Sequence, residues 1–188
     1  GSPATVASAG QRYFGFVTGG SLPAALAANW LAGAWDQNAS LRVMSPIGVK
    51  LEDVANRWLT ELLGLPADCG IAYTSGATMA NLAGLAAARH ALLARLDWDV
   101  ERRGLFGAPE ITVVVGEEVH VSVLKALSLL GFGRDRVIRV PVDSQGRMRA
   151  NALPKLNAQT IVCTQTGNVN TGAFDPVGAI GEQTQAAG

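Results

Sequence analysis

The sequence has few cysteines and no excess of charge of either sign. Its 2 cysteines, Cys69 and Cys163, lie far apart, and no cluster of histidines accompanies them. This pattern argues against a disulfide framework and a zinc site, so we expect a reduced, cytoplasmic protein with no metal. Lys plus Arg and Asp plus Glu each number 15. That balance disfavours nucleic acid and anionic membrane surfaces as partners.

Long apolar runs are missing as well. No segment reaches the roughly 18 consecutive apolar residues of a membrane-spanning helix, and the first residues do not resemble a secretory signal peptide. We therefore expect a soluble chain without a membrane partner. Hydrophobic residues nevertheless make up 48% of the 188 residues, which is enough for a packed core.

The first third of the chain is predicted to be helical. Residues 21–35, "SLPAALAANWLAGAW", have apolar residues at helical spacing, with Ser21 as a candidate N-cap and Pro23 in the first turn. Residues 45–65 place an apolar stripe along one helix face, and Gly64 marks the expected end of that helix. We predict that residues 1–66 form an N-terminal helical segment.

From Ile71 onward, strand-like and helix-like segments alternate. The expected strands are 111–116, 136–142 and 160–167, and the expected helices are 77–96, 121–133, a short one within 149–156, and one that starts near 177. Such alternation predicts βαβ units with a mostly parallel sheet. We therefore predict an α/β fold, with residues 67–188 as the first part of an α/β domain.

The segment "TSGAT" (residues 74–78) places small residues directly before an Ala-rich helix. The free N–H groups of a first helical turn can bind an anion, Gly76 and Ala77 leave room for it, and Thr78 adds a hydroxyl. The spacing fits neither GxGxxG nor GxxxxGK[ST], which disfavours dinucleotide and P-loop sites. An ordinary N-cap is the alternative interpretation.

Two further loops are expected after strands. His120 follows the strand 111–116, although capping of the next helix by His120 and Ser122 is the structural alternative. In "TGNVNTGAFDP" (residues 166–176), Asp175 is a candidate N-cap for the last helix. Because parallel strands end at one edge of a sheet, these loops together predict a pocket with an anion cradle, an imidazole and an amide.

The chain resembles the group II pyridoxal-phosphate-dependent amino-acid decarboxylases, relatives of aromatic-amino-acid and glutamate decarboxylase. The segments that carry the resemblance, in order, are "YFGFVTGGSLPAALAANWL", "SPIGVKLEDVANRWLTELLGLP", "TSGATMANLAGLAAAR", "HVSVLKA" and "GNVNTGAFDP". The resemblance implies a fold type I transferase architecture and a lyase of amino-acid metabolism that removes the α-carboxylate as carbon dioxide. It also implies pyridoxal 5'-phosphate as cofactor and a homodimer with its site at the interface.

The resemblance implies roles for individual residues near the cofactor. Gly76, Ala77 and Thr78 match contacts to the cofactor phosphate. His120 belongs to the family motif H-x-S-x-x-K/R-A, whose histidine stacks on the pyridine ring and takes part in catalysis. Asn168 replaces the first threonine of the family's G-T-T, and an amide at this position can still donate to the phenolic oxygen of the ring.

The resemblance also places Thr18 beside the substrate carboxylate and the stretch around Asn38 near the partner subunit's site. The family's H-x-D-A aspartate and its cofactor-binding lysine have no counterpart in this sequence. None of the lysines present matches the position of the cofactor-binding lysine. Those lysines are Lys50, Lys125 and Lys155. We therefore expect the N-terminal part of a decarboxylase, truncated before that lysine and inactive alone. The alternatives are a pyridoxal-phosphate-dependent carbon–carbon lyase or transaminase-like relative, a truncated non-catalytic homologue, and a nucleotide-binding protein.

Overall fold

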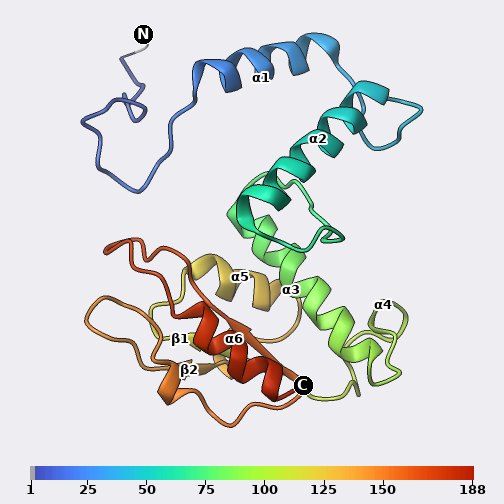
Figure 1. Cartoon of the computed structure of the whole chain (residues 1–188), viewed down its shortest axis with the longest axis vertical. Coiled ribbons are helices and arrows are strands. Elements are labelled where there is room, and N and C mark those ends of the chain that lie inside the picture. Colours follow the sequence, from blue (N-terminus) through green and yellow to red (C-terminus); the bar gives the residue numbers. More distant parts are fainter. Residues whose placement is uncertain (1–2) are drawn as a thin grey trace. The chain divides into compact units, whose positions relative to one another are not determined.

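The computed structural model describes residues 3–188, and the chain divides into two compact units between Ile71 and Ala72. Figure 1 shows the order of the elements along the chain. The division expected at residues 66/67 remains a prediction for the intact protein. Across residues 3–188, every helix is too short or too polar to span a lipid bilayer.

The first unit contains the two predicted helices. Helix α1 is Pro23–Trp35 and helix α2 is Pro46–Leu63. The prediction that Ser21 caps α1 is wrong: Leu22 is the N-cap residue, and its hydrocarbon side chain has no acceptor for a cap bond.

Helix α2 begins and ends with local signals that lie in its own sequence. The Ser45 hydroxyl accepts a hydrogen bond from the Gly48 N–H at 3.2 Å, and a proline occupies the first turn. Gly64 ends the helix as predicted, with a left-handed φ of 62° that a residue with a side chain seldom adopts. Neither α1 nor α2 buries any of its side chains within the described structure.

The second unit confirms the predicted α/β fold. Its helices are α3 (Ala77–Ala94), α4 (Val100–Arg103), α5 (Val121–Leu129) and α6 (Val177–Ala186), with 3-10 turns η1 (Arg134–Arg136) and η2 (Ala150–Ala152). Its strands are β1 (Thr112–Gly116), β2 (Ile138–Val140) and β3 (Thr160–Cys163). They pair in the order β2-β1-β3, and both pairings are parallel.

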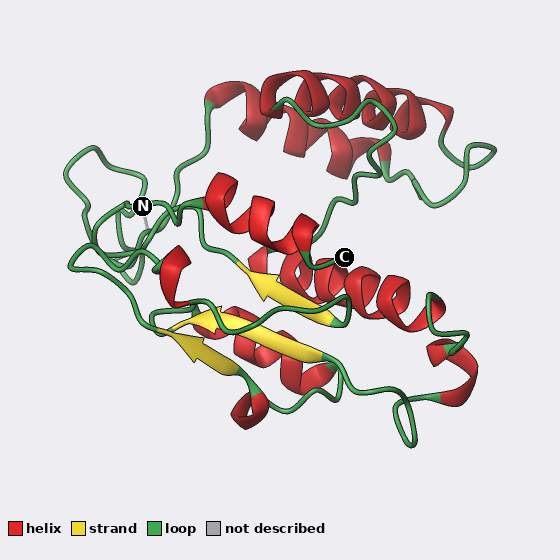
Figure 2. Ribbon diagram, turned by 60° about the horizontal axis from the view of Figure 1, so that its bottom comes forward, coloured by secondary structure: helices red, strands yellow, loops and turns green. Residues whose placement is uncertain are grey.

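Side chains of β1 alternate between two hydrophobic clusters on opposite faces of the sheet. Val113 and Val115 pack with residues of α3 and α5, while Val114 packs with Ile180 of α6. Figure 2 shows the strands with helices on both sides. The apolar, β-branched run of residues 113–115 is what a parallel strand covered on both faces requires.

Two sequence expectations for this unit need correction. Residues 71–74 form no strand before α3, so the glycine turn does not follow a strand of this sheet. The helix expected within 149–156 shrinks to the single turn η2. The reason lies at Pro154, which disfavours helical geometry for the residue before it, and Leu153 is indeed extended with ψ 139°.

We predict that Leu127→Ala destabilises the second unit by about 2–5 kcal/mol, because a fully buried side chain leaves a cavity when it is truncated. Leu127 is 0% exposed, whereas Leu129 on the same helix is 71% exposed. Leu129→Ala is therefore the matched control and should change stability by less than about 0.5 kcal/mol. Urea unfolding followed by circular dichroism measures both, and equal losses would contradict this description of the core.

Candidate functional site

The first turn of α3 is open. Gly76 is the N-cap residue with extended backbone, and no side chain makes a cap bond there. Its neighbour Thr74 donates to the Gly76 carbonyl at 3.2 Å and does not reach the helix N–H groups. A Cβ added at Gly76 would meet no atom within 4 Å. The structure therefore does not support the ordinary N-cap interpretation, and it leaves these N–H groups available to an outside acceptor.

His120 is the N-cap residue of α5 and stands at the carboxyl end of β1. Its Nδ1 accepts a hydrogen bond from the Ser122 N–H at 3.2 Å and lies 2.8 Å from the Ser122 hydroxyl oxygen. The capping interpretation is therefore correct for His120. This cap engages only Nδ1, so the other ring nitrogen and the ring face remain available for another contact.

Asn81, which sequence reasoning missed, ties α3 to α5. Its side-chain N–H donates to the Ser122 hydroxyl at 2.8 Å. At the far end of the same helix pair, Arg89 donates to the Leu130 carbonyl at 3.1 Å. The Asn81 contact joins the N-terminal part of α3, which follows the glycine turn, to the first turn of α5, whose N-cap residue is His120. The only sequence signal for Asn81 is a polar residue one turn into an Ala-rich helix.

Asn168 is buried, and its side chain organises its own loop. Its amide N–H donates to the Glu118 carboxylate at 2.7 Å, and its carbonyl oxygen accepts from the N–H groups of Asn170 at 2.9 Å and Thr171 at 3.3 Å. A Cβ at Gly146, where φ is +76°, would overlap both the Asn168 amide and Glu118. Asn168 has two amide N–H donors, and the bond to Glu118 engages one of them.

Asp175 connects the loops that follow β2 and β3. Its buried carboxylate accepts hydrogen bonds from the Met148 N–H and the Gln165 N–H, both at 2.7 Å. The prediction that Asp175 caps α6 is wrong, because Pro176 is the N-cap residue and makes no side-chain cap bond. The carboxylate instead satisfies two backbone donors from distant parts of the chain, which local sequence signals do not reveal.

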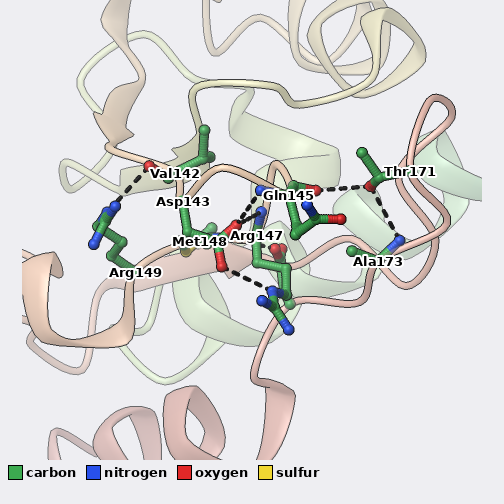
Figure 3. Close-up of polar contacts among 9 residues, drawn as sticks. Val142, Asp143, Gln145, Arg147, Met148, Arg149, Thr171 and Ala173 are labelled. Carbon is green, nitrogen blue, oxygen red and sulfur yellow. Dashed lines mark hydrogen bonds and ion pairs between the residues drawn. The ribbon is translucent and has the colours of Figure 1, made fainter.

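A turn at Asp143 completes this edge (Figure 3). The Asp143 carboxylate accepts from the N–H groups of Gln145 at 2.8 Å and Arg147 at 3.0 Å, and the Arg147 side chain donates to it at 2.8 Å. The backbone bond from Arg147 is the main cause of the lowered pKa of Asp143. Thr171 donates to the Gln145 carbonyl at 2.7 Å, so the turn also holds the loop of Asn168.

Cys163 ends β3 beneath these loops. Burial raises the pKa of its thiol to about 11, so the thiol is neutral near pH 7 and serves as an apolar packing group. It lines a cavity of about 10 Å³ with Glu118, Gln165 and Asp175, which is room for roughly one water molecule. A cavity of about 330 Å³ lies at the opposite, amino edge of the sheet, lined by residues such as Ile111 and Phe132.

The remaining predicted site residues, Thr18 and Asn38, belong to the first unit. Both are exposed, and the Asn38 side-chain oxygen accepts from the Ser40 N–H at 3.1 Å. Lys50, Lys125 and Lys155 are also exposed, as expected of solvated lysines. Within residues 3–188, no group of three or more His, Cys, Asp or Glu side chains could hold a metal ion.

These features define a class of protein: a parallel α/β domain with an open helix N-terminus beside an imidazole at the carboxyl edge of its sheet. The chain belongs to the pyridoxal-dependent decarboxylase family, since the model of that family's conserved domain matches residues 5–187. The predicted family is therefore confirmed, and with it the family's cofactor, pyridoxal phosphate.

Individual relatives agree with this assignment. The chain is similar to the human acidic amino acid decarboxylase GADL1, with 27% identity over 91% of the chain and 33% of the relative. It is also similar to an L-2,4-diaminobutyrate decarboxylase of Rhizobium meliloti, with 30% identity over 86% of the chain and 32% of the relative. The chain thus spans about a third of the length of these curated relatives.

Solved structures show the same fold. Mouse CSAD in its apo form superposes with a TM-score of 0.78 and 26% identity, over 90% of this chain and 36% of that one. Oryza sativa TDC with PLP and tryptamine has a TM-score of 0.75 and 24% identity, over 89% of this chain and 37% of that one.

We predict that Asp175→Ala destabilises the second unit by about 3 kcal/mol or more, because a buried and a part-buried N–H group lose a charged acceptor. Asp135→Ala removes an aspartate whose side chain is 96% exposed, and it should leave stability within about 0.5 kcal/mol of the wild type. Thermal or urea unfolding measures the difference. A loss for Asp175→Ala no larger than that of the control would show that the carboxylate does not hold the loops.

Proposed function

We propose that the second unit binds pyridoxal phosphate as part of an enzyme that removes the α-carboxylate of an amino acid as carbon dioxide. The observation that carries this proposal is the uncapped first turn of α3 at Gly76, which the contact between Asn81 and Ser122 holds beside His120. Family membership supplies the cofactor, and this geometry supplies a place for its two most distinctive parts, the phosphate and the ring.

The phosphate fits the first turn of α3. Unpaired N–H groups and the positive end of the helix dipole attract an anion, and the open space at Gly76 lets it approach the backbone. Ala77 has no polar atom to compete with it, and the Thr78 hydroxyl can add a hydrogen bond. No basic side chain is required for this contact, which agrees with the absence of lysine from the segment.

His120 would hold the ring. Because its cap uses Nδ1 alone, the flat face of the imidazole is free to stack on a pyridine ring at the carboxyl edge of the sheet. The remaining N–H donor of Asn168 is suited to the phenolic oxygen. When bound, pyridoxal phosphate supplies an electron sink for the bond to the carboxylate. His120 and Asn168 would orient that ring and keep it in one plane.

The substrate is an amino acid, as it is for the relatives named acidic amino acid decarboxylase and L-2,4-diaminobutyrate decarboxylase. We assign Thr18 and Asn38 to the substrate side of the site. We also propose that residues 1–188 alone do not turn over amino acids, because each lysine in them is exposed and outside the loops at the sheet edge. The free thiols Cys69 and Cys163 suit a reducing cytoplasm.

We predict that Gly76→Asp weakens binding of pyridoxal phosphate without destabilising the fold. An aspartate is a better N-cap than most residues, a Cβ at this position meets no atom within 4 Å, and the added negative charge would repel an anion at the helix start. Titration with pyridoxamine phosphate, followed by fluorescence, measures the affinity, which should fall at least about tenfold, or 1.4 kcal/mol.

Gly84→Asp is the matched control, because Gly84 lies on the same helix with open space for a Cβ. It adds the same charge two turns away and should leave the affinity within about twofold, since an exposed charge at that distance is screened by salt. Equal affinities for the wild type and Gly76→Asp would place the phosphate elsewhere.

We further propose that the first unit binds a second copy of the chain. Helices α1 and α2 keep large apolar side chains in solvent, among them Trp30, Trp35, Trp58 and Leu62. An accumulation of exposed large apolar side chains on one pair of helices supports an association surface in a folded protein. A homodimer with the site at its interface would also bring Asn38 to the partner's site.

We predict that Leu62→Glu converts a dimer into a monomer. Leu62 is 80% exposed in the single chain, so the charge costs little folding energy but would be buried unpaired in an interface. Leu129→Glu, at a comparably exposed position of the second unit, should leave the dimer intact. Analytical ultracentrifugation decides, and a wild-type monomer at concentrations of tens of micromolar would reject the proposed association.

A further inference from the structure

We propose that Asn81 is a positioning residue for His120, and that it acts through the hydroxyl of Ser122. This inference rests on the proposed function, because it concerns the residue that would orient the cofactor ring. Asn81 would not touch the cofactor. It would set which nitrogen of His120 carries the proton and hold the imidazole at a constant place relative to the glycine turn.

The contacts form a short chain between two helices. Asn81, one turn into α3, donates from its side-chain nitrogen to the Ser122 hydroxyl oxygen at 2.8 Å. That oxygen lies 2.8 Å from Nδ1 of His120, and the Ser122 backbone N–H reaches the same nitrogen at 3.2 Å. Ser122 is only 4% exposed, so water does not compete freely for its hydroxyl.

The direction of each hydrogen bond follows from the donors. A backbone N–H can only donate, so the Nδ1 atom that it contacts must present a lone pair. The Asn81 amide N–H fills an acceptor position of the Ser122 hydroxyl, which directs the hydroxyl hydrogen toward Nδ1. The neutral ring of His120 therefore carries its proton on Nε2, and Asn81 reinforces this tautomer.

Asn81 also connects the two parts of the site mechanically. It belongs to the helix whose first turn would hold the phosphate, and its partner Ser122 belongs to the first turn of the helix that His120 caps. A phosphate bound at Gly76 and an imidazole at His120 are thus separated by one helical turn and two hydrogen bonds. Loss of the Asn81 contact would let α5 and its imidazole move relative to the phosphate turn.

The test compares Asn81→Ala with Asn81→Asp by nitrogen-15 NMR of the imidazole groups. Asn81→Ala removes the donor, whereas Asn81→Asp keeps the shape but accepts the Ser122 hydroxyl hydrogen and so reverses the chain. The protein has 2 histidines, and His90, bonded to Glu101 at 2.9 Å, is the internal reference. Asn151→Asp, at an exposed position on η2, controls for the added charge.

In the wild type at alkaline pH, the Nδ1 signal of His120 should show an unprotonated nitrogen. Asn81→Asp should shift this signal toward a mixture of tautomers, while His90 and the Asn151→Asp control keep the wild-type pattern. Asn81→Ala should weaken binding of pyridoxamine phosphate about two- to tenfold, the size of one lost hydrogen bond. A structural role alone would not move the tautomer signal of the isosteric variant.

An unchanged His120 signal in Asn81→Asp would overturn the proposal. This outcome would overturn it even if Asn81→Ala fails to fold. Failure of the proposed function has a different signature. If the wild type does not bind pyridoxamine phosphate while Asn81→Asp still shifts the His120 signal, Asn81 positions the imidazole and the proposed cofactor binding by the second unit is wrong. If the wild type binds it and the His120 signal does not shift, the cofactor assignment stands and the role of Asn81 is rejected.

Discussion

Burial of β1 between two parallel neighbours is the constraint on which the rest of the second unit depends. Val113, Val114 and Val115 pack into clusters on both faces, so β1 cannot slip by one residue without exchanging the clusters. This register fixes where β1 ends and therefore where His120 lies. The parallel pairing brings the loops after all three strands to the same edge.

At that edge, the loops are held by buried polar groups. Asp175 joins the segments that follow β2 and β3, and Asn168 joins its own loop to Glu118 after β1. Asp175 satisfies the buried Met148 N–H, which would otherwise lack a hydrogen bond, so it contributes to stability as well as to order. A ligand arriving at this edge would meet loops that already have their shape, which lowers the cost of binding.

Much of the fold could be predicted from the sequence, and the reasons are local. The β-branched run of β1 and the apolar periodicity of α2 report burial directly, and Gly64 has the backbone freedom that a helix end requires. Asp175 was misread as a helix cap because Met148, one of its two partners, is 27 residues away in the chain. The role of Asn81 was missed for the same reason, since its partner Ser122 is 41 residues away.

The sequence by itself determined the family and the alternation of strands and helices, and it marked the turn at Gly76 as a candidate anion site. These features depend on side-chain type and on spacing over a few residues, and both can be read directly from the sequence. Only the tertiary structure decided that Asp175 braces two loops, that Asn168 is engaged with Glu118, and that Asn81 reaches Ser122. Residues far apart along the chain become hydrogen-bond partners only when the helices pack on the sheet. A local sequence pattern therefore does not predict these pairs.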